Sequence, residues 1–240
     1  MTRAAAVIPA RFQSTRFPGK PLAQIQGKPV LRWVYEGVQQ SRSVDRIIIA
    51  TDDPRISDTA AAFGAEVIMT SPDHRCGTDR VAEVAEKLPH SIVLNVQGDE
   101  PLIKGGDIDR LVEVLQDPSI PMVSLMAKVR DVRLIHDSHL VKVVVDVDGY
   151  ALYFSRSPLP CLSDDFFYLH SGIYGFQRDF LLQFARMPAS RLERLEKLEQ
   201  LRVLENGRRI KMIEAAYPAL RVDTPQDIIR VEEFLKQSAG

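Results

Sequence analysis

The 240-residue sequence contains only two cysteines, Cys76 and Cys161, which lie far apart. Neither belongs to a Cys-x-x-Cys or Cys-x-x-His spacing, so a structural zinc site is not expected. A disulfide framework is not expected either, which favours a reducing compartment. No apolar run approaches the roughly 20 residues of a membrane-spanning helix, and the N-terminal run is too short for a signal peptide. We therefore expect a cytoplasmic protein.

The sequence also lacks an excess of charge of either sign. Its 31 Lys and Arg residues nearly balance 32 Asp and Glu residues, which gives a formal net charge of −1. Such a balance gives the whole protein no electrostatic attraction for nucleic acid or for a membrane surface, so neither is expected as a partner. Any anion must instead be bound by a local cluster of cations.

The densest local cluster lies in residues 9–21, directly after the apolar run 4–8. Its cations and hydroxyls are Arg11, Ser14, Thr15, Arg16 and Lys20. Fixed positive charge, hydroxyl donors and a Pro-Gly turn suit a polyphosphate, and open α/β sheets bind ligands beyond the carboxyl ends of their strands. The segment is not a Walker A motif, because Lys20 is followed by Pro21 rather than Ser or Thr. An ordinary charged surface loop is the alternative interpretation.

Apolar runs alternate with amphipathic segments through the first half of the chain. The runs predict strands at 4–8, 46–50, 66–69, 91–96 and 122–129. The amphipathic segments predict helices at 29–40, 54–63, 78–88 and 107–115. This order predicts a Rossmann-like three-layer α/β fold, with a mostly parallel central sheet and helices on both faces.

The pattern changes in the second half. Asp148 and Gly149 form a hairpin turn signal between two short apolar segments. We predict strands at 140–147, 150–155, 172–176 and 210–215 and helices at 178–184, 192–205 and 224–236. The whole chain, 1–240, is interpreted as one nucleotide-binding domain. An antiparallel substrate-binding or dimerisation subdomain is inserted at about 130–190.

Two carboxylates follow predicted strands. Asp99 comes directly after strand 91–96, where a metal bound to a triphosphate would lie, because Mg²⁺ is held by one or two carboxylates plus substrate phosphates. A turn-forming Asp is the equal alternative for Asp99 alone, but a phosphate-binding loop at the same sheet edge favours the metal. Asp223 precedes the last helix, where N-capping is a strong alternative. Thr224 would then cap while Asp223 points elsewhere.

Three further segments carry candidate polar groups. Residues 76–80 open a helix, and the free N–H groups there suit an anion or a base. A plain N-cap is the favoured interpretation of Thr78, while Arg80 faces either a phosphate or solvent. Segments 170–175 and 198–202 hold candidate sugar-binding groups, although the second is equally compatible with an ordinary charged helix face.

Four blocks of sequence together resemble the CMP-KDO synthetases, the 3-deoxy-manno-octulosonate cytidylyltransferases of lipopolysaccharide synthesis. They are residues 9–21, 95–101, 151–156 and 198–204. The match keeps the order of the motifs over nearly the whole chain. Ser171 is a departure, because an apolar residue is expected at its position.

The resemblance implies a nucleotidyltransferase fold and two substrates, CTP and KDO or a close analogue such as 8-amino-KDO. It also implies a homodimer. For CTP it implies contacts from Arg11, Ser14, Lys20, Thr78, Arg80 and Gln97. For Mg²⁺ it implies Asp99 and Asp223, and for catalysis Lys20, Arg11 and Asp99. For the sugar it implies Gln97, Arg156, His170, Tyr174, Glu199 and Gln200.

Two alternatives stay open at this point. One is a sialic acid or other sugar nucleotidyltransferase on the same scaffold. The other is a non-catalytic nucleotide-binding module, although paired carboxylates such as Asp99 and Asp223 argue against a protein that only binds.

Overall fold

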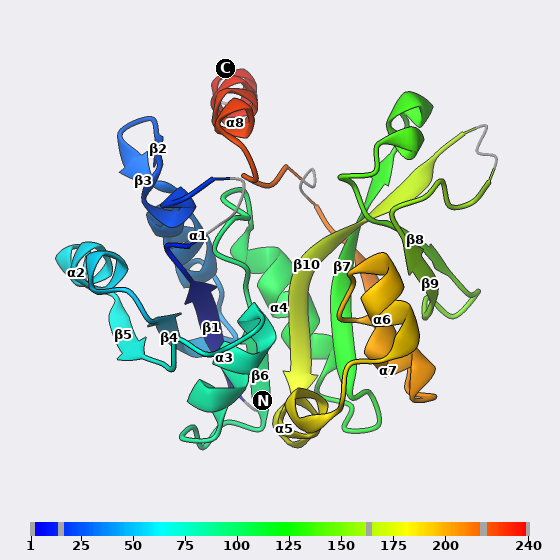
Figure 1. Cartoon of the computed structure of the whole chain (residues 1–240), viewed down its shortest axis with the longest axis horizontal. Helices are drawn as coiled ribbons and strands as arrows, with labels where there is room; N and C mark the ends of the chain where they lie inside the picture. Colours follow the sequence, from blue (N-terminus) through cyan, green and yellow to red (C-terminus); the bar gives the residue numbers. More distant parts are fainter. Residues whose placement is uncertain (1–2, 14–16, 162–164, 217–219, 239–240) are drawn as a thin grey trace.

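A computed structural model describes residues 3–13, 17–161, 165–216 and 220–238. Its centre is a nine-stranded sheet in the order β11-β7-β10-β6-β1-β4-β5, with β8 and β9 attached alongside β10 (Figure 1). The strands of the first half are β1 (Ala4–Ala10), β4 (Val44–Thr51), β5 (Glu66–Met69), β6 (Ile92–Asn95) and β7 (Met122–Val129). Strand β1 runs parallel to both β4 and β6, and β4 runs parallel to β5. The predicted mostly parallel sheet is confirmed.

Helices cover both faces of this sheet. Those of the first half are α1 (Val30–Gln39), α2 (Pro54–Ala62), α3 (Gly77–Ala85) and α4 (Gly105–Val114). Those of the second half are α5 (Arg178–Arg186), α6 (Arg191–Glu196), α7 (Leu201–Glu205) and α8 (Pro225–Ser238). Two 3₁₀ turns, η1 (Lys20–Leu22) and η2 (Val132–His136), and a short pair, β2 (Gln24–Ile25) and β3 (Lys28–Pro29), complete the outer layers.

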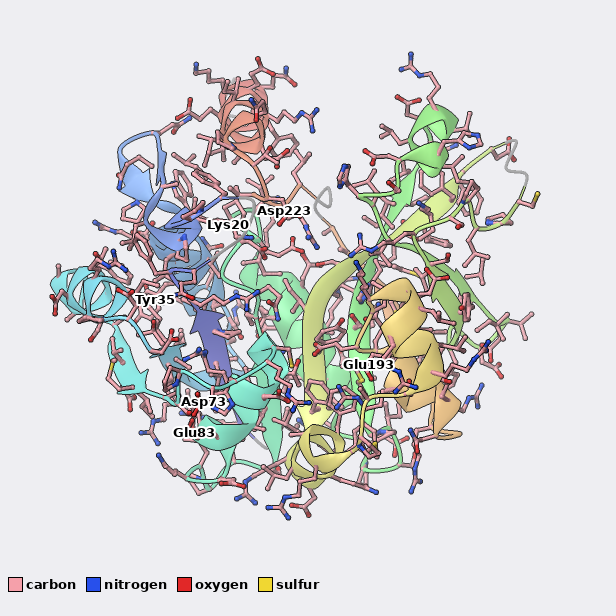
Figure 2. The ribbon with its side chains drawn as sticks, viewed as in Figure 1. Lys20, Tyr35, Asp73, Glu83, Glu193 and Asp223 are labelled. Atoms are coloured by element: carbon pink, nitrogen blue, oxygen red, sulfur yellow. The ribbon has the colours of Figure 1, made fainter. Side chains whose placement is uncertain are left out.

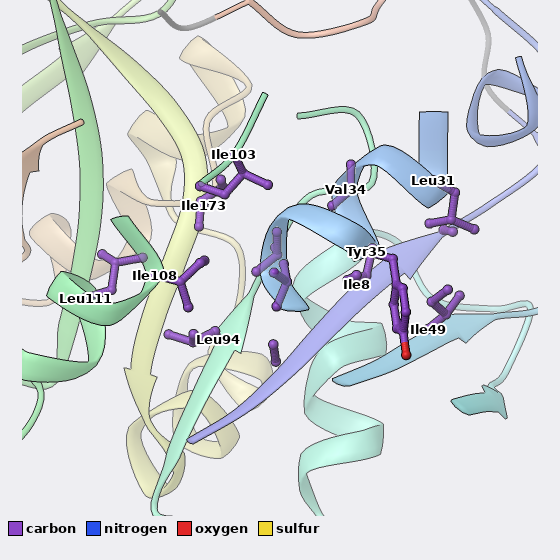
Figure 3. Close-up of a cluster of buried hydrophobic side chains, with 14 of the residues drawn as sticks. Ile8, Leu31, Val34, Tyr35, Ile49, Leu94, Ile103, Ile108, Leu111 and Ile173 are labelled. Atoms are coloured by element: carbon purple, nitrogen blue, oxygen red, sulfur yellow. The ribbon is translucent and has the colours of Figure 1, made fainter. Parts of the chain in front are cut away.

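The buried strand β1 explains the three layers. Its side chains alternate, so Ala6 and Ile8 enter one hydrophobic cluster with α1 and α4 (Figure 3). Ala5 and Val7 enter a second cluster with α3 and α5 on the opposite face. A strand buried on both faces reads as a continuous apolar run, which is why the sequence identified it.

The second half adds antiparallel pairing. It contributes β8 (Lys142–Val145), β9 (Ala151–Ser155), β10 (Phe167–Gln177) and β11 (Lys211–Glu214). Strand β10 is antiparallel to β6, β7 and β8, and its pairing with β7 is irregular between Ser171 and Tyr174. It begins at Phe167 rather than at residue 172 as predicted. The β8–β9 hairpin is therefore joined to the main sheet through one long strand.

The single helix predicted at 192–205 is wrong. Helix α6 ends where Lys197 adopts the left-handed conformation, with φ of 57°, and α7 begins only at Leu201. The left-handed region favours glycine, so a lysine there gives no stop signal in the sequence. The break turns residues 197–200 toward the interior of the cleft described below.

The last helix lies beside the first part of the chain. Figure 1 shows α8 next to β2 and β3, and the backbone N–H of Gln26 donates to Glu232 Oε1 at 2.8 Å. Within the described part of the chain, no helix combines the length and apolar character that crossing a membrane requires.

Candidate active site

Two adjoining pockets open at the carboxyl ends of β1 and β6. The first, here called the loop pocket, is lined by residues that include Arg11, Lys20, Cys76, Arg80, Gln97 and Asp99. The second, the inner pocket, is lined by residues that include Gln97, Arg156, His170, Tyr174, Glu199 and Gln200. Arg11, Gln97 and Asp99 line both pockets. The predicted sugar-binding residues, and Arg11, Lys20, Arg80 and Gln97 of the predicted nucleotide-binding residues, therefore surround one continuous cleft.

Lys20 joins the two predicted metal ligands. Its Nζ lies 2.6 Å from Asp99 Oδ2 and 3.2 Å from Asp223 Oδ1, although Asp223 is 203 residues away in the sequence. Figure 2 labels Lys20 and Asp223 beside one another below α8. Gly19 makes the approach possible, because its φ of 72° turns the chain into η1 directly before Lys20.

Arg221 is a member of this cluster that sequence reasoning missed. It donates to Asp223 Oδ2 through both Nε, at 2.7 Å, and Nη2. Burial alone would raise the pKa of Asp223, but Arg221 and Lys20 outweigh it and lower the pKa to about 2. Asp223 is thus an ionised carboxylate held from two sides. The Arg-x-Asp spacing before the last helix was the sequence signal that could have identified Arg221 as a partner of Asp223.

Glu100, next to Asp99, is almost completely buried behind the cluster. Burial, and then the charge of Asp99, raise the pKa of Glu100 to about 7. The hydroxyl of Ser171 donates to Glu100 Oε1 at 3.2 Å. This contact explains the departure noted at Ser171, because a polar side chain at this position gives a buried carboxyl a hydrogen-bond partner.

Arg80 faces the loop pocket and not solvent. Its side chain is buried, donates to Thr70 Oγ1, and has Nη2 3.3 Å from Asp52 Oδ1. The two partners fix the guanidinium at the pocket wall. Ser14, predicted to contact CTP, lies outside the described residues.

Thr78 is not the N-cap of α3, so that expectation is wrong. Cys76 occupies the N-cap position, and the Thr78 hydroxyl is fully buried. It donates to Glu199 Oε1 at 2.5 Å and accepts from Asn95 Nδ2 at 2.9 Å. A contact of Thr78 with CTP stays a prediction.

Neutral hydrogen-bonding groups form one wall of the inner pocket. His170 Nε2 lies 2.9 Å from Ser124 Oγ, and its Nδ1 lies 3.3 Å from Gln200 Nε2. Burial, followed by the charge of Arg221, lowers the pKa of His170 to about 3. The hydroxyl of Tyr174 donates to Gln200 Oε1 at 3.3 Å, and burial raises the pKa of Tyr174 well above its usual value. His170 and Tyr174 are therefore uncharged near neutral pH and suited to binding hydroxyl groups.

Glu199 is a half-buried carboxyl group of the same pocket. Burial raises the pKa of Glu199, while hydrogen bonds from Thr78 and Cys76 and the charge of Arg202 oppose that shift. Arg202 is itself held by Glu193 at 2.8 Å through Nε. The helix break at Lys197 is what places Glu199 and Gln200 in the pocket rather than on a solvated helix face.

The peptide groups of Arg156 are held on both sides. The N–H of Arg156 donates to Glu196 Oε2 at 3.3 Å, and its carbonyl oxygen accepts from Lys142 Nζ at 2.5 Å. The ammonium of the fully buried Lys142 also donates to the carbonyls of Asp137 and Leu140, both at 2.9 Å. This fixes the end of β9 and hence the position of Arg156 at the inner pocket. Sequence reasoning missed Lys142, which reads as one polar residue inside an apolar strand.

Comparisons with known proteins agree on one family. Residues 5–210 match the family model described as cytidylyltransferase. The 3-deoxy-manno-octulosonate cytidylyltransferase of Geobacter sulfurreducens is 49% identical over 96% of this chain and 98% of its own length. That of Syntrophotalea carbinolica is also 49% identical, again over 96% of this chain and 98% of its own length.

A solved structure gives the same result for the fold. The CMP:2-keto-3-deoxy-manno-octonic acid synthetase complexed with CTP superposes with a TM-score of 0.92 at 40% identity, covering 99% of this chain and 100% of its own. This agreement confirms the predicted nucleotidyltransferase fold. The chain belongs to the 3-deoxy-manno-octulosonate cytidylyltransferase family.

Proposed function

We propose that this protein is a cytidylyltransferase that activates 3-deoxy-manno-octulosonate, or its 8-amino analogue, with CTP. The products are the CMP-sugar and pyrophosphate. The observation that carries the proposal is the cluster of Lys20, Asp99 and Asp223 beside a pocket with one wall of uncharged hydrogen-bonding groups. The relatives named above favour neither a sialic acid enzyme nor a non-catalytic binding module.

The reaction joins two anions. The anomeric hydroxyl oxygen of the sugar attacks the α-phosphorus of CTP, the bond to the bridging oxygen breaks, and the hydroxyl proton is released. Negative charge builds on the leaving pyrophosphate. Lys20 and Arg11 lie in the loop pocket, where fixed cations stabilise such charge without reorganising. Because Lys20 is already held by two carboxylates, its ammonium is positioned before CTP binds.

The donor set fits Mg²⁺. Asp99 and Asp223 bring carboxylate oxygens to the same cationic nitrogen, and Mg²⁺ is commonly bound by one or two carboxylates together with substrate phosphates. Across the described residues, no three His, Cys, Asp or Glu side chains form a ready-made metal cage. Phosphate oxygens of CTP and water would complete the coordination. When bound, Mg²⁺ supplies neutralising charge to the triphosphate and to the attacking oxygen. Asp99, between the two pockets, is the carboxylate proposed to link metal and nucleophile.

The inner pocket is proposed to bind the sugar. His170, Tyr174 and Gln200 present uncharged donors and acceptors to its hydroxyls. The guanidinium of Arg156 lies in the same pocket, where it suits the sugar carboxylate. We further propose that the enzyme acts in the cytoplasm as a homodimer, without nucleic acid or membrane partners, and that its product supplies lipopolysaccharide synthesis.

Pyrophosphate release by the purified protein with Mg²⁺, CTP and KDO tests the proposal. UTP replaces CTP, and N-acetylneuraminate or 8-amino-KDO replaces KDO, in parallel reactions. Release that requires CTP and an octulosonate supports the assignment. Release with N-acetylneuraminate alone would move the chain to a different sugar, and CTP binding without release under any condition would leave a binding module.

A further inference from the structure

A row of buried polar side chains crosses from the loop pocket to Glu199 in the inner pocket. Gln97 Nε2 donates to Asn95 Oδ1 at 2.9 Å, and Asn95 Nδ2 donates to Thr78 Oγ1 at 2.9 Å. The Thr78 hydroxyl donates to Glu199 Oε1 at 2.5 Å. Asn95 and Thr78 are fully buried. Among the described residues, no direct hydrogen bond joins Gln97 to Glu199.

The hydrogen bond at Glu199 fixes the direction of the others in the row. The Thr78 hydroxyl donates to Glu199 Oε1, so its single proton points toward that carboxyl group. Thr78 Oγ1 must then accept from the amide nitrogen of Asn95, which turns the Asn95 oxygen toward Gln97. That oxygen requires the amide nitrogen of Gln97 as its donor. The carbonyl oxygen of Gln97 and the second N–H of its amide are then left for other partners.

The Gln97 side chain is also confined between two glycines. A Cβ atom on Gly77 would lie 3.5 Å from both terminal atoms of the Gln97 amide, and one on Gly172 would lie 3.4 Å from Gln97 Cγ. Both glycines line the inner pocket. The backbone therefore encloses the side chain while Asn95 sets which way its amide faces.

We infer that Asn95 is a positioning residue that holds Gln97 with its carbonyl oxygen toward the cleft, so that this oxygen accepts a hydrogen bond from a hydroxyl of the acceptor sugar. A phosphate oxygen only accepts hydrogen bonds, so it cannot be the partner of the Gln97 oxygen. The sugar brings O–H donors and enters the inner pocket, which Gln97 and Gly172 line together. This inference rests on the proposed function, because it assigns a partner to Gln97 within that reaction.

Steady-state kinetics with Asn95→Leu test the role. Leucine keeps the size of the side chain but removes both hydrogen-bonding groups. We expect the KM for KDO to rise about tenfold, the effect of losing one buried hydrogen bond. The dissociation constant of CTP, measured by calorimetry without sugar, should stay within about twofold, because the oxygen that Asn95 orients cannot hydrogen-bond a phosphate. Adding Asn95→Leu to Gln97→Ala should cause no further loss.

Asn206→Leu is the matched control. Asn206 Nδ2 donates to the carbonyl of Arg202 at 2.7 Å at the end of α7, outside both pockets. It should leave both constants unchanged. An Asn95→Leu protein that loses CTP affinity as strongly as sugar affinity, or that keeps a normal KM for KDO, would overturn the inference.

A spectroscopic measurement keeps the inference testable if Asn95→Leu does not fold or if the wild type proves inactive with KDO. The side-chain amide signal of Gln97 is assigned in ¹⁵N-labelled protein by its loss in Gln97→Ala. Glu199→Gln supplies a donor at the far end of the row, so the chain of bonds can reverse, and the Gln97 signal should shift. An unmoved Gln97 signal would refute the fixed polarity whatever the reaction, whereas inactivity of the wild type with KDO would refute only the proposed function.

Discussion

Replacing Lys20 by methionine should separate catalysis from stability. Methionine fills similar space but removes the ammonium that contacts Asp99 and Asp223 at 2.6 and 3.2 Å. The three side chains are only 16–18% exposed, and a hydrogen bond to a charged group contributes about 1.5–3 kcal/mol. Asp223 keeps Arg221, so we expect a loss of about 1–2 kcal/mol in the free energy of unfolding, which lowers Tm by about 2–8 °C.

The loss of activity should be far larger than this loss of stability explains. Removing one preorganised electrostatic group from an active site costs roughly 10²–10³-fold in turnover. A domain that begins with about 5–15 kcal/mol of stability and loses about 2 kcal/mol stays almost entirely folded at 25 °C. The pKa of Asp223 should also rise, because Lys20 is one of the two cations that lower it.

Lys28→Met is the control for this experiment. Lys28 Nζ pairs with Glu36 Oε2 at 2.6 Å, the same distance as the Lys20–Asp99 pair, but the two side chains are 35% and 32% exposed and lie outside both pockets. A pair of this exposure contributes only about 0–1 kcal/mol. Pyrophosphate release, CTP calorimetry and thermal unfolding are measured on both variants. Wild-type kcat and CTP affinity in Lys20→Met would refute its assignment to the site.

Three more perturbations follow from the same structure. Asp99→Asn should lower pyrophosphate release by at least about 10²-fold while circular dichroism stays native, and near-normal release would remove Asp99 from the mechanism. His170 has a pKa of about 3 in the folded protein against an ordinary 6.5, so the unfolded chain binds one more proton between these values. The free energy of unfolding should therefore rise with pH across this window, and the contribution of His170 should be fully present above pH 6.5. In denaturant unfolding of His170→Gln, the slope of this free energy against pH should be smaller by about 1.4 kcal/mol per pH unit. A slope equal to that of the wild type would contradict the buried neutral imidazole. Gly105→Ala would place a Cβ 2.3 Å from the backbone carbon of Gln40 and should lower the free energy of unfolding by about 1–3 kcal/mol. The Cβ of Gly106→Ala would meet no atom within 4 Å, so this variant should be neutral or stabilising. Equal denaturant midpoints for the two variants would refute the packing of α4 against the end of α1.

The parallel part of the sheet and one edge of the candidate site could be predicted from the sequence. Buried parallel strands read as apolar runs, and residues that follow them, such as Arg11 and Asp99, lie together once the strands pair. Local rules failed at Lys197, because the periodicity of helix 192–205 continues through a residue with positive φ.

The supporting residues could not be predicted from local sequence for a different reason. Arg221, Lys142 and Asn95 act through partners that only the folded chain brings close. Asn95 ends an apolar strand, and its contact with Thr78 depends on how α3 packs against β6. No periodicity or motif encodes such a contact, whereas a loop with three cations is visible directly in the sequence.

The contact between Lys20 and Asp223 also sets the order in which the site can be completed during synthesis. Lys20 and Asp99 leave the ribosome long before Arg221 and Asp223, and Val222 N–H joins the Asp99 carbonyl at 2.9 Å only when the last segment arrives. A nascent chain with the parallel strands already folded still lacks one carboxylate of the cluster and the guanidinium beside it. The cluster is therefore complete only after residues 221–223 have left the ribosome and α8 has docked against β2.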